Sequence, residues 1–181
     1  MNTIPAFRNW WLLGLKGLLL LLFGLSLIFD FQVFWPLYTF TGYFFLAVGL
    51  VMVVFAASNA FIVPFWFWLI EGIAEIIIGT IILFIKSGMT YGDFSFLLVI
   101  WTFIIAAGIL LSRLEKQRFL SSKGIRIIFP VLSLIAGILI LISNSNKFIT
   151  TEDIIGIFAI LLSTFYIFNS IKYSTSIKTK A

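Results

Sequence analysis

The sequence predicts an all-α integral membrane protein with six transmembrane helices, arranged as three parallel two-helix repeats. The chain of 181 residues is 62% hydrophobic and only 10% charged, with a mean hydropathy of +1.18. Soluble domains are about 45–50% apolar and about 25% charged, so this composition excludes a water-soluble class. Apolar runs of about 17–25 residues, long enough to cross a hydrocarbon core roughly 30 Å thick, recur along the chain. We place the spans at 9–29, 37–57, 65–85, 94–112, 127–143 and 153–171.

Residues typical of turns and interfaces separate these runs. The first span follows Arg8 and lacks a small-residue cleavage site after it, which indicates an uncleaved span and not a signal peptide. Pro36 precedes the second span and Pro64 the third. The stretch "KSGMTYGD" precedes the fourth span, and "SNSNK" precedes the sixth.

The longest break between spans is a basic loop at 112–126, which separates the fourth span from the fifth. The polar residues 172–181 after the sixth span are expected to form a short disordered tail. None of these polar stretches is long enough to fold as a soluble domain. We therefore expect one membrane domain over 1–181.

The distribution of Lys and Arg predicts the orientation, because short basic loops stay in the cytoplasm. With six spans, both termini and the 112–126 loop share one side, and they hold nine basic residues against Lys86 and Lys147 on the other. Both termini are therefore predicted to be cytoplasmic, in the bacterial inner membrane. Tryptophans at the cytoplasmic ends of the first and third spans agree, since indole rings favour the interface. They are Trp10, Trp11, Trp66 and Trp68.

The chain also repeats itself. Aligning "WLLGLKGLLLLLFG" (11–24) with "WFWLIEGIAEIIIG" (66–79) superposes Lys16 on Glu71, and a weaker third copy begins at Pro130. Each repeat contains two spans, so all copies point the same way through the membrane.

Glycines recur seven residues apart within these repeats, which places gaps on one face of each helix. In lipid, such gaps are where helix backbones approach closely, so we interpret them as packing surfaces and not as a ligand site. Ile82 is expected to face lipid instead. The packing glycines are Gly17, Gly24, Gly42, Gly49, Gly72, Gly79, Gly108, Gly137 and Gly156.

Three residues of charged types lie well inside predicted spans, away from the span ends: Lys16, Glu71 and Glu75. Such groups are expensive in lipid and indicate a functional site by default. Lys16 and Glu71 lie at equal depth in the repeat, so they can pair if the first and third spans pack through their glycines. Glu75, one turn from Glu71 on the same face, is then left to hold a proton. Two interpretations stay open. In the first, Lys16 extends to the cytoplasmic interface, Glu71 does the same or pairs with it, and Glu75 is simply neutral. In the second, Glu75 is a proton-binding group inside the bundle.

The sequence gives little basis for enzyme chemistry. It has no histidine, no cysteine, no nucleophile elbow and no metal-ligand cluster, so we predict no catalytic residue, no metal and no cofactor. Membrane topology explains the net charge of +5, and nucleic-acid binding is not predicted. The basic loop is interpreted as an orientation signal; the alternative is a patch that binds anionic lipid at the cytoplasmic face. Its residues are Arg113, Lys116, Arg118, Lys123 and Arg126.

Several stretches together resemble the HdeD-like acid-resistance membrane proteins. They are "RNWWLLGLKGLLLLLFGLSLIF", "WLIEGIAEIIIGTIILF", "IWTFIIAAGILL" with the basic loop that follows, and "LSLIAGILIL". The resemblance covers nearly the whole chain, but it rests on glycine, tryptophan and loop spacings and not on a catalytic signature. It implies a small bacterial inner-membrane protein of a family linked in some members to acid stress, without established enzymatic activity.

Two functions follow from these observations. The first is a non-enzymatic inner-membrane protein of acid or envelope stress resistance or membrane homeostasis, responding to protons through its buried carboxylates. The alternative is a small proton-linked transporter or channel that uses Lys16, Glu71 and Glu75. A transporter is expected to have broken spans with central proline, whereas Pro36, Pro64 and Pro130 lie near span ends. The sequence therefore favours the first.

The orientation can be tested with topology reporters. Because the basic residues gather on one side, reporters fused after Ala181 and within 121–123 should both report the cytoplasm, and one near Met89 should report the outside. A periplasmic signal from the Ala181 fusion would contradict six spans.

Overall fold

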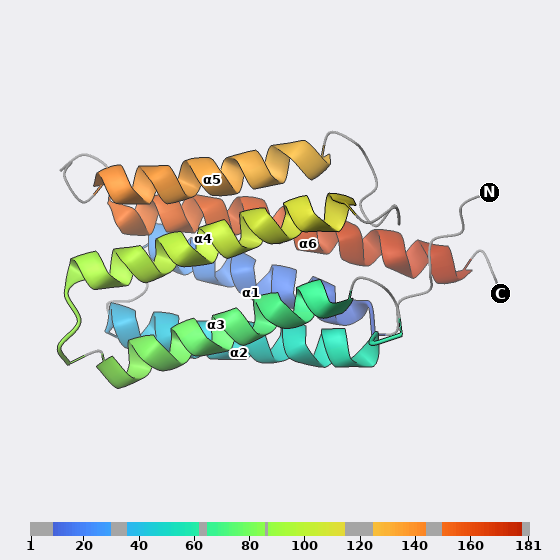
Figure 1. Cartoon of the computed structure of the whole chain (residues 1–181), viewed down its shortest axis with the longest axis horizontal. Coiled ribbons are helices and arrows are strands. Elements are labelled where there is room, and N and C mark those ends of the chain that lie inside the picture. Colours follow the sequence, from blue (N-terminus) through green and yellow to red (C-terminus); the bar gives the residue numbers. More distant parts are fainter. Residues whose placement is uncertain are drawn as a thin grey trace.

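A computed structural model describes residues 9–29, 36–61, 65–85, 87–114, 125–143 and 150–178. All regular structure in these residues is α-helical, in six helices that follow one another along the chain (Figure 1). The helices are α1 (Trp11–Ile28), α2 (Leu37–Ser58), α3 (Phe65–Ile85), α4 (Tyr91–Leu114), α5 (Ile125–Ser143) and α6 (Thr151–Lys178). The prediction of an all-α chain with six helices is confirmed.

Five of the six helices, all except α5, are long and apolar enough to cross a membrane. The apolar part of α5 is shorter, at Ile127–Ser143. The expectation of a disordered tail from residue 172 was wrong, because α6 continues to Lys178 and the Tyr173 side chain is buried. A helix already packed along the bundle can extend past the apolar run, since the added turns keep their backbone hydrogen bonds.

Side-chain hydrogen bonds cap the starts of two helices, α4 and α6. Thr90 and Asp93 exchange hydrogen bonds at the start of α4: the Thr90 backbone N–H donates to Asp93 Oδ2 at 3.0 Å, and the Asp93 N–H donates to Thr90 Oγ1 at 3.2 Å. Thr150 and Asp153 repeat this arrangement at the start of α6. Such reciprocal caps satisfy backbone donors that the first helical turn leaves unpaired. Pro36 caps α2.

The helices form an elongated bundle in which the chain runs back and forth (Figure 1). The closest pairs are α2 with α3, α1 with α6 and α4 with α5, whereas α1 with α2, α3 with α4 and α5 with α6 pack less closely. Helices from neighbouring predicted repeats therefore pack more tightly than the two helices of one repeat. The beginning of α1 and the end of α6 lie at the same end of the bundle.

Glycines occupy the two tightest interfaces. At α2–α3, a Cβ added at Gly49 would lie 2.7 Å from the Gly72 carbonyl oxygen, and one at Gly79 would lie 2.7 Å from that of Gly42. At α1–α6, a Cβ at Gly24 would lie 2.6 Å from the Gly156 carbonyl oxygen. These distances are too short for a real Cβ, so glycine lets the backbones touch.

The other three predicted packing glycines do not face another glycine. Gly17 lies against Ile167 and the Ser163 backbone of α6. At the fourth and fifth helices, Gly137 lies against the Thr102 hydroxyl, while Gly108 lies against the Phe67 ring of α3. The α4–α5 pair thus lacks the glycine-to-glycine contacts of the other two pairs.

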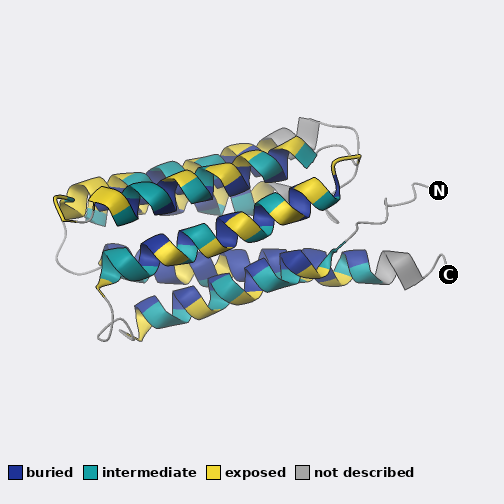
Figure 2. Cartoon of the chain, turned by 90° about the horizontal axis from the view of Figure 1, so that it is seen from below, coloured by how far each residue is buried: buried dark blue, intermediate teal, exposed yellow. Residues whose placement is uncertain are grey.

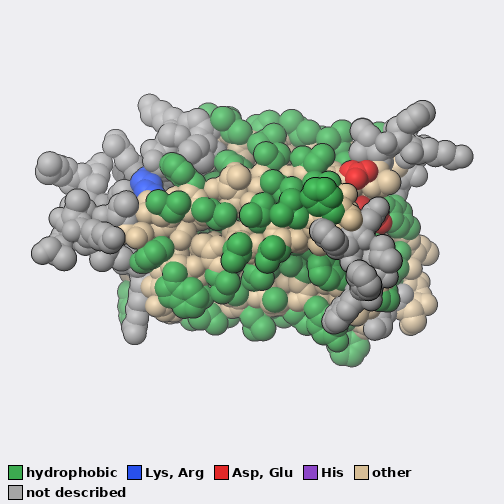
Figure 3. Space-filling view, turned by 180° about the vertical axis from the view of Figure 1, so that it is seen from behind, with side chains coloured by type: hydrophobic (Ala, Val, Ile, Leu, Met, Phe, Trp, Pro, Cys, Tyr) green, Lys and Arg blue, Asp and Glu red, His purple; other side chains and the backbone are tan. Residues whose placement is uncertain are grey.

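Buried residues face the inside of the bundle and exposed residues face outward, as Figure 2 shows. Hydrophobic side chains spread over most of the visible face in Figure 3, and the coloured acidic side chains lie toward the end opposite the termini. Two expectations were wrong. Ile82 is fully buried, and Trp68 is only 4% exposed, so it lies in the core and not in the interface. Trp11 and Trp66 are partly exposed, at 53% and 37%.

The glycine interfaces can be tested by adding one methyl group. Gly79→Ala should lower the thermal stability of the protein in detergent by about 1–3 kcal/mol, because the new Cβ meets backbone atoms of α2 that cannot move aside. Gly92→Ala is the control, since its Cβ would meet only the Thr90 hydroxyl at 3.7 Å, within the same turn. Equal melting temperatures for the two variants would contradict close backbone contact.

Candidate functional site

Lys16 lies at the centre of a buried polar cluster. Its side chain is fully buried, and its Nζ donates to Glu71 Oε1 at 2.7 Å and to Glu75 Oε1 and Oε2 at 2.8 and 3.1 Å. The same Nζ lies 4.6 Å from the centre of the Tyr166 ring, a favourable position for a cation. The ammonium therefore has partners on two different helices besides its own.

The structure brings together Lys16, Glu71 and Glu75, as the sequence predicted, but through a different packing of the helices. The glycines of α1 face α6 and those of α3 face α2, so α1 and α3 do not pack through their glycines. The Lys16 side chain instead crosses the interior of the bundle to reach α3. Glu75 is also not left over, because the ammonium binds both of its oxygens.

The sequence places these side chains by a simple helical rule. Lys16 directly precedes Gly17, and Glu71 directly precedes Gly72. Neighbouring residues in a helix point about 100° apart, from 3.6 residues per turn. When each glycine faces its partner helix, the preceding residue turns toward the interior. Glu75 follows one turn later on the same side as Glu71.

Two aromatic residues complete the site, and sequence reasoning did not include them. The Trp101 indole of α4 donates to Glu75 Oε1 at 3.2 Å, and the Tyr166 hydroxyl of α6 donates to Glu71 Oε1. Both side chains are buried. A signal existed: a buried tryptophan or tyrosine in the middle of a span needs a hydrogen-bond partner. We call Lys16, Glu71, Glu75, Trp101 and Tyr166 the Lys16 cluster.

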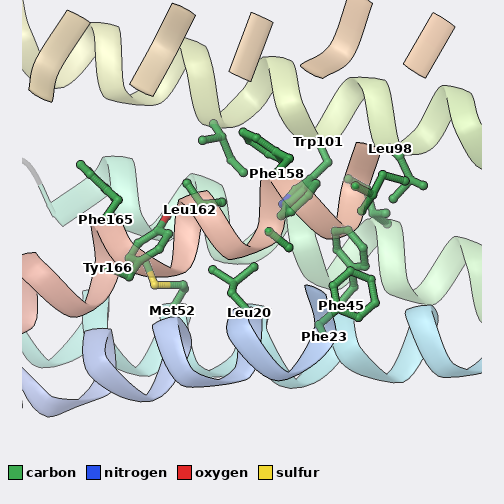
Figure 4. Packing of buried hydrophobic residues seen from close by; sticks show 14 of the residues in the cluster. Leu20, Phe23, Phe45, Met52, Leu98, Trp101, Phe158, Leu162, Phe165 and Tyr166 are labelled. Atoms are coloured by element: carbon green, nitrogen blue, oxygen red, sulfur yellow. The ribbon is translucent and has the colours of Figure 1, made fainter. Parts of the chain in front are cut away.

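Aromatic and apolar side chains enclose the cluster along the bundle. On one side, the Trp101 ring packs edge-on against Phe45 and Phe158, with centroids 5.0 and 5.7 Å apart, and Figure 4 shows Phe45 and Phe23 on the same side of Trp101, away from Tyr166. On the other side, nearer the termini, the Tyr166 ring lies 5.4 Å from Phe165 and 6.4 Å from Trp68. Trp101 and Tyr166 thus belong both to the hydrogen-bonded cluster and to its apolar surroundings.

The charges of the cluster do not balance. One ammonium faces two carboxyl groups, so the cluster is neutral only when one carboxyl is protonated. Charge left unpaired in the interior of a membrane protein costs several kcal/mol. The arrangement can therefore bind one proton beyond those of Lys16, and gaining or losing that proton changes the net charge of the core by one.

The other predicted site residues belong to the basic loop that follows the fourth span in the sequence. Of the predicted anionic-lipid contacts, Lys116, Arg118 and Lys123 lie outside the described residues, and Arg113 and Arg126 are described only as backbone near the ends of α4 and α5. Lipid binding by this loop stays a prediction. Within the described part of the chain, no group of three or more acidic side chains could hold a metal ion.

Comparison with known proteins adds no assignment. The chain matches no protein-family model, and neither the curated proteins nor the solved structures give a match. The site must therefore be interpreted from its own geometry.

Because Glu71 and Glu75 share one ammonium, we expect substitutions at these two residues to have non-additive effects on stability. Glu71→Gln or Glu75→Gln alone leaves one carboxylate to pair with Lys16 and replaces the other by a neutral acceptor, so each should cost about 0.5–1.5 kcal/mol of stability, the net range of an ordinary hydrogen bond. The double variant strands the ammonium, and breaking a buried pair costs about 3–5 kcal/mol, so its loss should exceed the sum of the single losses. Adding Lys16→Met to the double variant should restore stability. Thermal melting in detergent measures these effects.

The matched control is Glu152→Gln, the same chemical change in the first turn of α6, outside the cluster. It should combine additively with either cluster variant. Additive losses for Glu71→Gln and Glu75→Gln would show that Lys16 is not shared between them.

Proposed function

We propose that this chain is a non-enzymatic, multi-pass protein of the bacterial inner membrane that acts in acid or envelope stress resistance or membrane homeostasis. The Lys16 cluster takes up a proton as the pH falls. One observation carries the proposal: a single buried ammonium lies within 2.8 Å of oxygens from two carboxyl groups. A chain without histidine must build a pH response from other groups, and these are its carboxyls inside the membrane.

The proposed orientation places the beginning of α1 and the end of α6 in the cytoplasm. Three features support it: the nine basic residues on that side of the sequence, the partly exposed Trp11 and Trp66 at the starts of α1 and α3, and Asp93 and Asp153 at the opposite ends. Tryptophan at the interface and basic residues inside are the usual pattern of bacterial membrane proteins.

We also propose that the bundle derives from three parallel two-helix repeats. The support is that two tight interfaces use equivalent residues: Gly72 meets Gly49 and Gly79 meets Gly42, while Gly17 meets Ser163 and Gly24 meets Gly156. Relatedness to the HdeD-like proteins remains part of this proposal, and it rests on the sequence resemblance alone.

A proton-linked transporter or channel is the weaker proposal. Such a protein needs the site to open to one side of the membrane at a time, often through helices broken near the site. The described side chains pack the cluster between aromatic layers, and α5 continues through Pro130 without a break. These features favour a protein that senses or buffers charge over one that conducts it.

The proposed function can be tested in an acid-sensitive bacterial strain. Expression of the wild-type chain should raise survival after acid shock, and the variant Lys16→Met/Glu71→Gln/Glu75→Gln should lose that gain at equal protein level, because it retains no titratable carboxyl in the cluster. Glu152→Gln should protect as well as wild type. Full protection by the triple variant would overturn the proposal.

A further inference from the structure

The Lys16 cluster lies closer to one end of the bundle than to the other. On α3, Glu71 lies about 9 Å along the axis from Phe65, where the helix begins, whereas Glu75 lies about 15 Å from Ile85, where it ends. We propose that the cluster exchanges its proton with water at the near end, where α1 begins and α6 ends. This inference rests on the proposed function and adds the side of the membrane: the cluster responds to cytoplasmic pH and not to external pH.

Apolar side chains separate the cluster from the far end, opposite the termini. The Trp101 ring packs against Phe45, and Figure 4 shows Leu98 and Phe23 on the same side of Trp101. Phe23 in turn stacks on Phe44, with ring centroids 3.9 Å apart. The described buried polar side chains nearest the far end all lie within the first two turns of α2, α4 and α6: Thr41, Ser95 and Thr151.

No described hydrogen bond connects these far-end polar side chains with the cluster. Ser95 lies about 9 Å along α4 from Trp101, and its hydroxyl donates to the Tyr91 carbonyl oxygen of the same helix at 2.9 Å. Thr41 is buried, and within the described residues its hydroxyl has no hydrogen-bond partner. A proton entering from this end would have to pass the aromatic layer around Trp101, where a charge is unfavourable.

A stripe of polar side chains on α6 leads from the cluster toward the near end. Tyr166, which donates to Glu71, is followed on the same face of the helix by Asn169 and Tyr173. All three α6 side chains are buried. Asn169 lies about 4.5 Å beyond Tyr166 along the axis, and Tyr173 about 10 Å beyond it, so polar atoms recur once per turn.

Neighbouring segments add polar groups to the near half of the bundle. Asn59, directly after α2, is buried, and its Nδ2 donates to the Phe55 carbonyl oxygen at 2.8 Å. The Ser170 hydroxyl of α6 donates to the Trp10 carbonyl oxygen at 3.3 Å. The buried indole of Trp68 also lies in this half, three residues before Glu71 on α3. Hydrogen-bonding side chains thus continue from the cluster to the near end.

The contacts of the two carboxyl groups show the same asymmetry. The charged or titratable side chains that contact them are Lys16 of α1 and Tyr166 of α6. From α4 they receive the neutral Trp101 indole, and the described α2 side chain packed against Gly72 is apolar, Met52. A tyrosine hydroxyl both donates and accepts hydrogen bonds, whereas an ammonium or an indole N–H only donates. Tyr166, on the near side, is therefore suited to pass a proton. Exchange at one end agrees with a sensor, because a transporter must open to both sides.

Infrared spectroscopy of the full chain in lipid vesicles can test the side of exchange. A protonated carboxyl has a C=O band, and the band belongs to the cluster if acid produces it in wild type but not in Lys16→Met/Glu71→Gln/Glu75→Gln. A tag after Ala181 measures the fraction of chains whose termini point outward. When only the outer solution is acidified, the band should grow in proportion to this fraction across preparations of mixed orientation.

The other outcomes overturn the inference in distinguishable ways. A band that falls as the outward fraction rises means exchange at the far end, and a band that does not depend on orientation means exchange at both ends. In both cases the cluster still takes up a proton. If acidifying both solutions produces no band, the cluster takes up no proton, and the proposed function fails together with this inference.

The route can be tested by the rate at which the band appears after rapid acidification of both solutions. Asn169→Leu should slow it at least about tenfold, equivalent to a barrier higher by about 1.4 kcal/mol, because the polar group next to Tyr166 is lost. Asn169→Ser keeps a polar group and should recover part of the rate. Thr41→Val, the control near the far end, should leave the rate unchanged. Slower uptake in Thr41→Val, or an unchanged rate in Asn169→Leu, would overturn the route, and the measurement of sidedness stands even if Asn169→Leu does not fold.

Discussion

The burial of one ammonium group constrains the interior of this protein more than any other interaction. Lys16 is fully enclosed, and its charge must be matched within hydrogen-bond distance, because an unmatched charge there costs several kcal/mol. Glu71 and Glu75 can match this charge only if α3 lies at the depth in the bundle that brings them to Lys16. Tyr166 of α6 and Trp101 of α4 then donate hydrogen bonds to these two carboxyl groups. Four helices are thereby held in one arrangement around a single side chain.

Glycine packing complements this constraint. Apolar burial gives little attraction between helices in lipid, since lipid tails are as apolar as leucine, so close backbone contact and hydrogen bonds decide which helices meet. Gly17 directs α1 against α6, and Gly72 directs α3 against α2. Because Lys16 and Glu71 each precede one of these glycines, the same contacts that assemble the pairs also turn the charges inward.

The sequence predicts where the helices lie along the chain, but it does not predict which helices pack against each other. Hydropathy locates the apolar runs, and equal depth in the repeat predicts that Lys16 can meet Glu71. It does not predict which helices lie side by side, so Trp101 and Tyr166 were not recognised as partners of the carboxyls. Ile82 and Trp68 were misplaced for a related reason: inward and lipid-facing residues are chemically alike in these spans. The sequence predicted a disordered tail in place of the last turns of α6, because the polar composition of these residues gives no indication that Tyr173 is buried.

The relative size of these interactions indicates what a proton would change. Aromatic pairs such as Trp101 with Phe158 contribute about 0.5–1.5 kcal/mol beyond their buried area, whereas one uncompensated charge in the core costs several kcal/mol. Trp101 and Tyr166 take part in both kinds of contact, since each donates to a carboxyl and packs in the aromatic core. A change in the charge of the cluster therefore alters the hydrogen bonds of the same two aromatic side chains that pack around it. The free-energy change is expected to exceed the stabilisation that their ring contacts provide.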